Sequence, residues 1–165
     1  MIGENKDIFV DRFGGVYEHS AWIAEDSWPA CQMANSAEEL ATILAHTLEC
    51  ASKHDKLKLI KAHPDLAGKL AVAGELTAES TSEQASAGLD QCSDEEFAEF
   101  QALNAAYVEK FDFPFVMAVR GSHRTDILQA FRRRLKNAYD VEFATAIQEI
   151  NKIARLRLEQ IFNGG

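Results

Sequence analysis

Apolar residues recur at three- and four-residue intervals along most of the chain, which predicts helices. One such run follows Ser36-Ala37-Glu38-Glu39, whose serine and glutamate have the spacing of a capping box at a helix start. A helix from about residue 37 would gather these residues on one face: Leu40, Ile43, Leu44, Thr47 and Leu48.

A second capping box, Ser93-Asp94-Glu95-Glu96, predicts another helix, whose apolar side would carry Phe97, Phe100, Asn104, Tyr107, Val108 and Phe111. The remaining helices are expected before Gly14-Gly15, over residues 20–28, over 126–137, and from a cap at Asp140 to about Ile161. Residues 74–93 are small and polar, which predicts a loop with one short helix that Ser82 caps.

Residues 113–121, with the sequence FPFVMAVRG, interrupt this helical pattern. Their aromatic and β-branched side chains, bounded by proline and glycine, are typical of a strand. Because the sequence offers no clear partner strand, we predict an extended segment between helices, whose backbone N–H groups are free to face a ligand. The predicted fold is therefore a compact all-α domain covering residues 1–165.

A histidine and a proline stand in the middle of the helical stretch LIKAHPDLAGKL. Proline disfavours the α conformation in the residue before it, so the incoming helix should end near His63. Pro64 suits the first position of a new helix, because its missing N–H is not needed there. We therefore expect His63 at a helix N-terminus, where an imidazole can meet an anionic ligand.

The composition narrows the function classes. A net charge of −9 over 165 residues argues against nucleic-acid binding, which needs a basic surface. The run Arg132-Arg133-Arg134 is interpreted as a solvated helix face. No apolar run has the length of a membrane span, and three scattered cysteines without a CxxC pair are typical of a reducing cytoplasm. The expectation is a cytoplasmic protein without membrane or nucleic-acid partners.

The last helix carries an arginine where an apolar residue is expected. Arg157 falls on the stripe formed by Phe143, Ile147, Ile150, Ala154 and Ile161, whereas Arg155 falls on the polar face. A charge directed into apolar surroundings needs a partner. Either Arg157 extends its charged end to water or pairs with a core carboxylate, or it is a buried clamp for an anion. Glu83 could likewise be structural or functional. It directly follows Ser82, the expected cap, and a carboxylate in the first turn stabilises a helix through its dipole.

Metal binding has one weak candidate. The adjacent His54-Asp55, with His19 or His46 as partner, would suit a metal phosphohydrolase. The pair lies in the charged stretch SKHDKLK, which we interpret as a solvated helix start. No HExxH motif, phosphate-binding glycine fingerprint or Gly-x-Ser-x-Gly elbow is present, so no metal site is predicted.

Several ordered segments together resemble the OHCU decarboxylases of uric acid degradation. They are FVDRFGGVYEHSAWIAE, LIKAHPDLAGKLA, LTAESTSEQASAGLD, FQALNAAYVEKFDFPFVMAVRG and EINKIARLRL, and they span almost the whole chain. The order His-Pro-Asp-Leu, Ser-x-x-Glu-Gln, Phe-Pro-Phe is specific, although each motif alone is weak.

This resemblance implies an all-helical homodimer that converts 2-oxo-4-hydroxy-4-carboxy-5-ureidoimidazoline to (S)-allantoin and CO2 without a metal or organic cofactor. It implies that His63, Glu83 and Arg157 are the catalytic residues. The implied substrate-binding residues are Pro64, Ser80, Thr81, Ser82, Gln84, Phe115, Val116, Met117, Ala118 and Val119.

Two other classes of function stay open as alternatives. The chain could be a helical ligand-binding module that has the pocket without the chemistry, or a metal hydrolase built on His54 and Asp55. The joint presence of His63, Glu83 and Arg157 favours the decarboxylase. That hypothesis requires these three side chains to converge on one small cavity.

Overall fold

The computed structural model describes residues 5–67 and 76–164, and within these ranges the protein is helical with no strand. The all-α prediction is therefore confirmed. The chain divides into two compact units, Met1–Ala62 with Ile150–Gly165, and His63–Glu149. The final helix, α9 (Tyr139–Gly164), contributes residues to both units. The expectation of a single domain stays a prediction.

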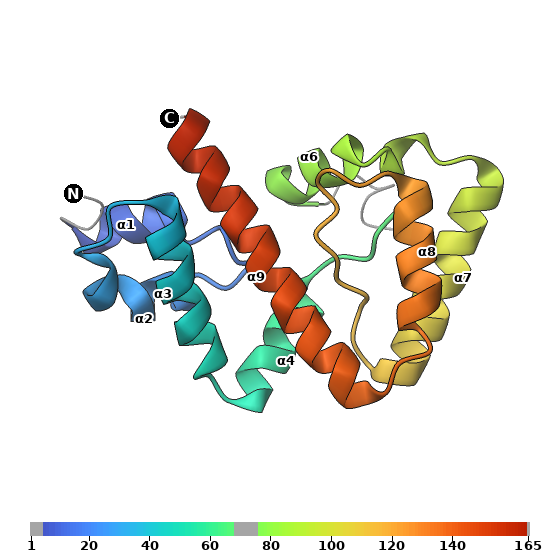
Figure 1. Ribbon diagram of the computed structural model, residues 1–165, viewed down its shortest axis with the longest axis horizontal. Helices are drawn as coiled ribbons and strands as arrows, with labels where there is room; N and C mark the ends of the chain where they lie inside the picture. Colours follow the sequence, from blue (N-terminus) through green and yellow to red (C-terminus); the bar gives the residue numbers. More distant parts are fainter. Residues whose placement is uncertain (1–4, 68–75, 165) are drawn as a thin grey trace. The chain divides into compact units, whose positions relative to one another are not determined.

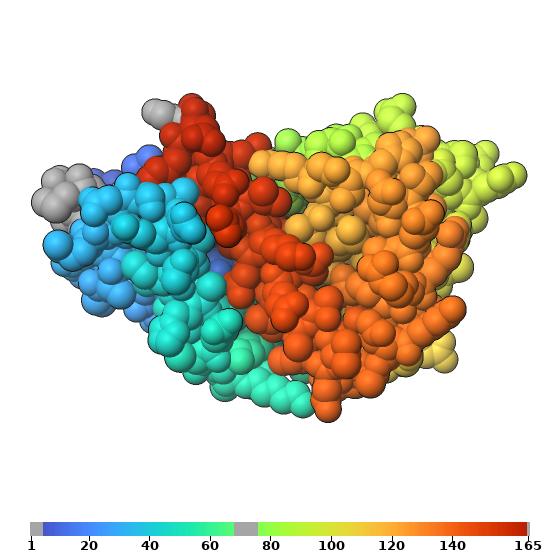
Figure 2. Space-filling view, viewed as in Figure 1, coloured from blue at the N-terminus to red at the C-terminus, as the bar shows by residue number. Residues whose placement is uncertain are grey.

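The first unit contains α1 (Lys6–Phe13), α2 (Trp22–Cys31), α3 (Ala37–Glu49), α4 (Lys53–Ala62) and the second half of α9 (Figure 1). Its core consists of apolar side chains that these helices direct inward at helical spacing, including Phe9, Phe13, Ile23, Leu40, Leu44, Leu48 and Leu158. The opposite face of α3 lies at the molecular surface, where Figure 2 shows it in cyan.

The second unit contains α6 (Ala78–Ser86), the short 3-10 helix η1 (Leu89–Gln91), α7 (Asp94–Phe111), α8 (Arg124–Arg134) and the first half of α9 (Figure 1). Its core is aromatic: the ring of Tyr107 contacts Phe111, Phe113, Phe115 and Phe131 at centroid distances of 4.5–5.9 Å. Such tilted and edge-to-face contacts are the favoured arrangements of aromatic rings.

Both segments predicted to be capping boxes begin helices, and of the two the full box forms at α7 alone. The hydroxyl of Ser36 accepts a hydrogen bond from the backbone N–H of Glu39, while the Glu39 carboxylate accepts from the N–H of Asn35 at 2.8 Å. At α7 both bonds of the box form between Ser93 and Glu96. These local interactions satisfy N–H groups that the first helical turn leaves without a partner.

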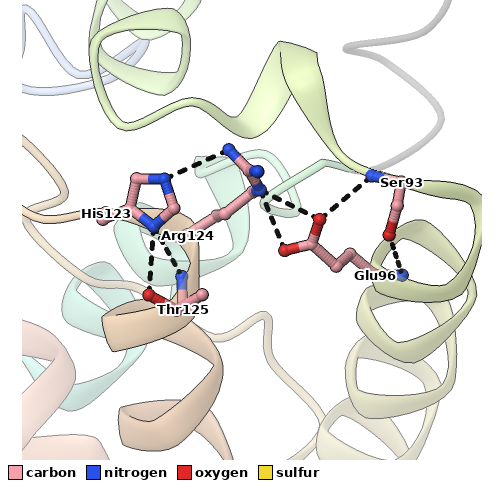
Figure 3. Close-up of polar contacts among 5 residues, drawn as sticks. All are labelled: Ser93, Glu96, His123, Arg124 and Thr125. Carbon is pink, nitrogen blue, oxygen red and sulfur yellow. Dashed lines mark hydrogen bonds and ion pairs between the residues drawn. The ribbon is translucent and has the colours of Figure 1, made fainter.

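The N-termini of α7 and α8 are joined by an ion pair (Figure 3). The Arg124 Nε donates to both oxygens of Glu96, at 3.0 and 2.8 Å, and the same carboxylate accepts from the backbone N–H of Ser93. His123 caps α8 and contacts Arg124 through Nε2, at 3.1 Å from Nη1. The backbone and arginine hydrogen bonds lower the pKa of the Glu96 carboxyl.

Two details of the predicted apolar face of α7 are wrong. Phe97 and Val108 are 38% and 40% exposed, whereas Phe100, Asn104, Tyr107 and Phe111 are buried. At about 100° per residue the four buried residues fall within an arc of about 60°, and the two exposed ones lie at its flank. The neighbouring elements therefore cover a narrower stripe than the hydrophobic pattern suggested.

The interpretation of the arginine run as solvated is wrong for Arg134. Arg132 and Arg133 are exposed, and the outer face of α8 lies at the surface in Figure 2, but Arg134 is buried. Its Nε donates to Glu142 Oε1 at 2.9 Å, and Glu142 is fully buried on α9. Arg134 follows Phe131 by three positions and therefore shares the inward face of α8.

Candidate active site

His63 lies directly after the last residue of α4. The helix ends at Ala62, which confirms the predicted end near His63, and His63 is 8% exposed. No helix begins at Pro64: residues 64 and 65 are irregular, and Leu66 and Ala67 form a turn. The expected placement of His63 at the first turn of a new helix is therefore wrong, because Pro64 is followed by irregular backbone and a turn rather than by helix. Residues 68–75 lie outside the described part of the chain.

The turn that follows His63 is bound by side-chain amides from two helices. Gln84, on α6, accepts from the N–H of Ala67 at 3.0 Å and donates to the carbonyl of Asp65 at 3.3 Å. From α7, Gln101 donates to the carbonyl of Ala67 and Asn104 to that of Leu66, both at 3.0 Å. Gln84, a predicted substrate-binding residue, thus contacts the segment that carries His63.

The position of α6 differs from the prediction. Thr77 caps the helix by accepting from the N–H of Ser80, and Ser82 lies within the helix as an exposed residue. Ser82 is therefore not the cap. The earlier start directs Ser80 and Gln84, four residues apart, toward the interior, while Thr81 is exposed and Glu83 is half-buried. Both Thr77 and Ser82 are good caps locally, so burial of this face decides between them.

Residues 114–119 lie between α7 and α8 and belong to no helix. The Phe115 ring stacks on Phe131 with centroids 3.9 Å apart, and the guanidinium carbon of Arg134 lies 4.2 Å from its centroid. The carbonyl of Val116 accepts from Arg134 Nη1 at 2.7 Å. Phe115, Val116 and Val119 are buried, and Met117 and Ala118 are half-buried. The side chain of Phe115 therefore packs in the core, and any contact it makes with a ligand would come from its backbone.

Arg157 is buried in the first unit, as its position on the apolar stripe predicted. It is 4% exposed, and its Nη1 lies 2.9 Å from the Oε2 of Glu18, which is 2% exposed. Nη1 also donates to the carbonyl of Gly15 at 3.4 Å. By contrast, Arg155 is 55% exposed and pairs with Glu159 four residues further along α9. A buried carboxylate partner for Arg157, one of the two alternatives, is therefore present.

A cavity of about 350 Å³ lies beside the same turn in the second unit. Its lining includes Ala67, Thr81, Gln84, Leu89, Asp90, Cys92 and Phe97. Two of the predicted substrate-binding residues, Thr81 and Gln84, therefore border it, whereas His63 is not part of its lining. The convergence of His63, Glu83 and Arg157 on one cavity stays a prediction.

The described residues give no support for a metal centre on His54 and Asp55, because among them no group of three or more His, Cys, Asp or Glu side chains is arranged to hold an ion. Within the same part of the chain, no helix is long and apolar enough to cross a membrane.

Sequence reasoning missed several residues around the candidate site. The amides of Gln101 and Asn104 were not assigned to the His63 turn, although Asn104 was placed on the apolar side of α7. Glu142 accepts hydrogen bonds from Tyr107 at 2.6 Å and from Asn137 at 3.0 Å, in addition to Arg134. The useful signal is a polar residue at a core position of a helix, since such a group needs a specific partner.

The fold and this site define an all-helical protein with a buried histidine at a helix end. Comparison with known proteins identifies the family. The OHCU decarboxylase family model matches residues 4–159, and the chain belongs to that family.

Relatives resemble the protein over most of its length. It is 43% identical to the 2-oxo-4-hydroxy-4-carboxy-5-ureidoimidazoline decarboxylase of Halalkalicoccus jeotgali, over 95% of this chain and 86% of that one. The enzyme of the same name from Haloferax volcanii is 42% identical, over 95% of this chain and 90% of the other. The crystal structure of an (S)-allantoin synthase superposes with a TM-score of 0.77 at 28% identity, covering 97% of this chain and 52% of that one.

Proposed function

We propose that the protein decarboxylates 2-oxo-4-hydroxy-4-carboxy-5-ureidoimidazoline to (S)-allantoin and CO2. The observation that carries this proposal is the match of the OHCU decarboxylase family to residues 4–159, with His63-Pro64-Asp65-Leu66 and Ser80-x-x-Glu83-Gln84 both present. The contact of Gln84 with the turn after His63 supports it, because it brings two of these motifs together.

The substrate itself can provide the electron sink for this reaction. The bond between the ring carbon and the carboxylate breaks and CO2 leaves. The electron pair forms a C=C bond between the two ring carbons, and the π pair of the adjacent C=N bond moves onto nitrogen, which takes up a proton. Protonation of the ureido-bearing carbon, with loss of the proton from the ring hydroxyl, then gives allantoin. Since no external electron acceptor is needed, we propose that the reaction requires neither metal nor organic cofactor. The protein must orient the carboxylate, stabilise the developing charge and deliver a proton to one face.

His63, Glu83 and Arg157 are the proposed catalytic residues. His63 would hydrogen-bond the hydroxyl at the carboxylate-bearing carbon and take part in proton transfer. Glu83 would orient His63 or a ureido N–H, and Arg157 would bind an oxygen-rich edge of the substrate. Backbone groups within residues 115–119 would position the ring, together with the predicted binding residues of α6 and Pro64.

The carboxylate of Glu18 sets a condition on the role of Arg157. Nη1 of Arg157 lies 2.9 Å from the Glu18 carboxylate. An arginine can serve a carboxylate and a substrate together, since its five donors point in several directions. Glu18 would then fix the orientation of Arg157 and compensate its charge when the substrate is absent.

We further propose a homodimer in the cytoplasm. The homodimer rests on family analogy alone, and the oligomeric mass in solution measured by light scattering tests it. The cytoplasmic location is supported by the free thiols of Cys31, Cys50 and Cys92, since sparse unpaired cysteines are typical of reducing compartments.

The decisive assay generates the substrate in situ and follows the optical activity of allantoin by circular dichroism. The substrate also decays without enzyme, and without stereocontrol. We expect the purified protein to speed its loss and to give (S)-allantoin. Racemic allantoin formed at the uncatalysed rate would leave the helical binding module as the better description of this chain.

A further inference from the structure

We propose that Gln101 and Asn104 are positioning residues that fix His63 for catalysis through the backbone turn after it. Together with Gln84 they form what we call the amide cradle, the side-chain amides of Gln84, Gln101 and Asn104. This inference rests on the proposed catalytic role of His63 and extends it to two residues of α7.

The cradle donates one hydrogen bond to the backbone carbonyl of each of three consecutive residues. The carbonyl of Asp65 accepts from Gln84, that of Leu66 from Asn104, and that of Ala67 from Gln101, at 3.3, 3.0 and 3.0 Å. The N–H of Ala67 donates to Gln84 as well, at 3.0 Å. Leu66 and Ala67 form a turn, and the three amides satisfy backbone groups of this turn that are buried from water.

The conformation of the turn also requires external support. Leu66 and Ala67 are 6% and 3% exposed, so water does not replace the amides readily. Ala67 has a φ of 50°, in the left-handed region that a residue with a Cβ rarely adopts. Such a conformation persists only where surrounding contacts specify it. The cradle supplies those contacts from two separate helices.

His63 lies between α4 and this turn. Within the second unit, the chain on its C-terminal side is fixed by Pro64 and the cradle-bound residues. Fixing this backbone limits the positions that the imidazole can take within the unit. Because a catalytic group displaced by about 1 Å can lose about a hundredfold in rate, this restraint matters for turnover.

The test compares three variants of α7. Asn104→Leu keeps the side-chain size and removes the donor to Leu66, and Gln101→Glu keeps the shape while replacing the donor to Ala67 with a carboxylate. Lys110→Met is the matched control, because it removes a bond of 2.8 Å from the same helix to a different carbonyl, that of Leu135.

We expect the first two variants to lose about a hundredfold in kcat. Their KM should change by less than about threefold, because the substrate contacts remain. Lys110→Met should have unchanged kcat and KM. A purely structural role would lower the melting temperature and leave the kcat of the folded fraction unchanged, and that result would overturn the proposal. If Asn104→Leu does not fold, Gln101→Glu, at a half-buried position, decides the question.

A second measurement does not depend on turnover. The protein has five histidines, and the imidazole NMR signal of His63 is identified by its absence from His63→Asn. We expect this signal to shift and broaden in the two cradle variants and to stay in place in Lys110→Met. An unchanged His63 signal in both cradle variants would contradict the proposal that the cradle positions His63. By contrast, full turnover by His63→Asn would overturn the proposed catalytic role and leave the spectroscopic test intact.

Discussion

The guanidinium of Arg157 and the carboxylate of Glu18 form an ion pair that is buried in the first unit, with Nη1 and Oε2 2.9 Å apart. Taking both charges out of water is expensive, and their attraction offsets this only while both are present. The two residues are therefore coupled, and the loss of either removes the opposite charge that the other faces in the core.

Glu18→Gln should destabilise the protein. Because the variant leaves Arg157 buried without its countercharge, we expect the free energy of unfolding to fall by about 3–5 kcal/mol. Urea denaturation measures this change. Glu25→Gln, at an exposed position of α2, is the control and should change stability by less than about 0.5 kcal/mol. Equal stability of the two variants would contradict the coupling.

Arg157 and Arg155 should differ in their effect on activity. Arg157→Ala removes the proposed substrate contact, and Arg157→Lys keeps a charge opposite Glu18 without the planar fork, so both should lower kcat/KM strongly. Arg155→Ala removes only an exposed pair with Glu159, whose side chains are 55% and 45% exposed, and should be nearly neutral. Steady-state kinetics distinguish them, and similar losses at both positions would refute the assignment from the helical pattern.

His63→Asn should nearly abolish turnover and leave the fold intact. General acid–base catalysis typically contributes about 10²–10⁴-fold, and we expect a loss in that range. Thermal unfolding followed by far-UV circular dichroism checks that the variant is folded. A folded His63→Asn protein with the wild-type rate would mean that His63 is a structural residue at the end of α4.

Arg134→Met should destabilise the second unit, whereas the neighbouring Arg133→Met should not. The first variant leaves Glu142 fully buried without its countercharge and removes the donor to Val116, at an expected cost of about 3–5 kcal/mol. Arg133 is exposed, so its replacement should change the free energy of unfolding by less than about 0.5 kcal/mol. Denaturant titration of both variants provides the comparison.

Glu96 should contribute to stability in a pH-dependent way. Its pKa is lowered in the folded protein, first by the backbone N–H of Ser93 and then by Arg124. A lowered folded pKa means that the stabilisation is complete above the unfolded pKa and disappears as the pH falls through the folded one. Melting temperatures of wild type and Glu96→Gln should therefore differ at neutral pH and converge in acid. A difference independent of pH would show that the carboxylate charge is not responsible.

Helix starts and ends were predictable because the interactions that set them are local. Ser36 and Ser93 cap α3 and α7 as their sequences indicate, and the proline after His63 ends α4. Each case involves side-chain and backbone groups within a few residues of each other. The burial of Arg157 was predictable for a related reason, since the helical repeat fixes which residues share a face.

Other features depended on residues far away in the sequence. Thr77 rather than Ser82 caps α6. A helix that begins at this earlier position directs Gln84 toward the backbone of Ala67, which lies 17 residues away along the chain. Arg134 belongs to a run of three arginines, and its burial is favourable because it binds Glu142 and the carbonyl of Val116, eight and eighteen residues away along the chain.

By itself, the amino-acid sequence determined the helical class, the starts of α3 and α7, the end of α4 and the resemblance that led to the family, because local hydrogen bonds and side-chain periodicity are properties of neighbouring residues. Only the tertiary structure decided which polar side chains are buried and what they bind, as with Glu18 beside Arg157 and Asn104 beside the His63 turn. A polar group enters the core only where a partner meets it, and that partner comes from a distant part of the chain.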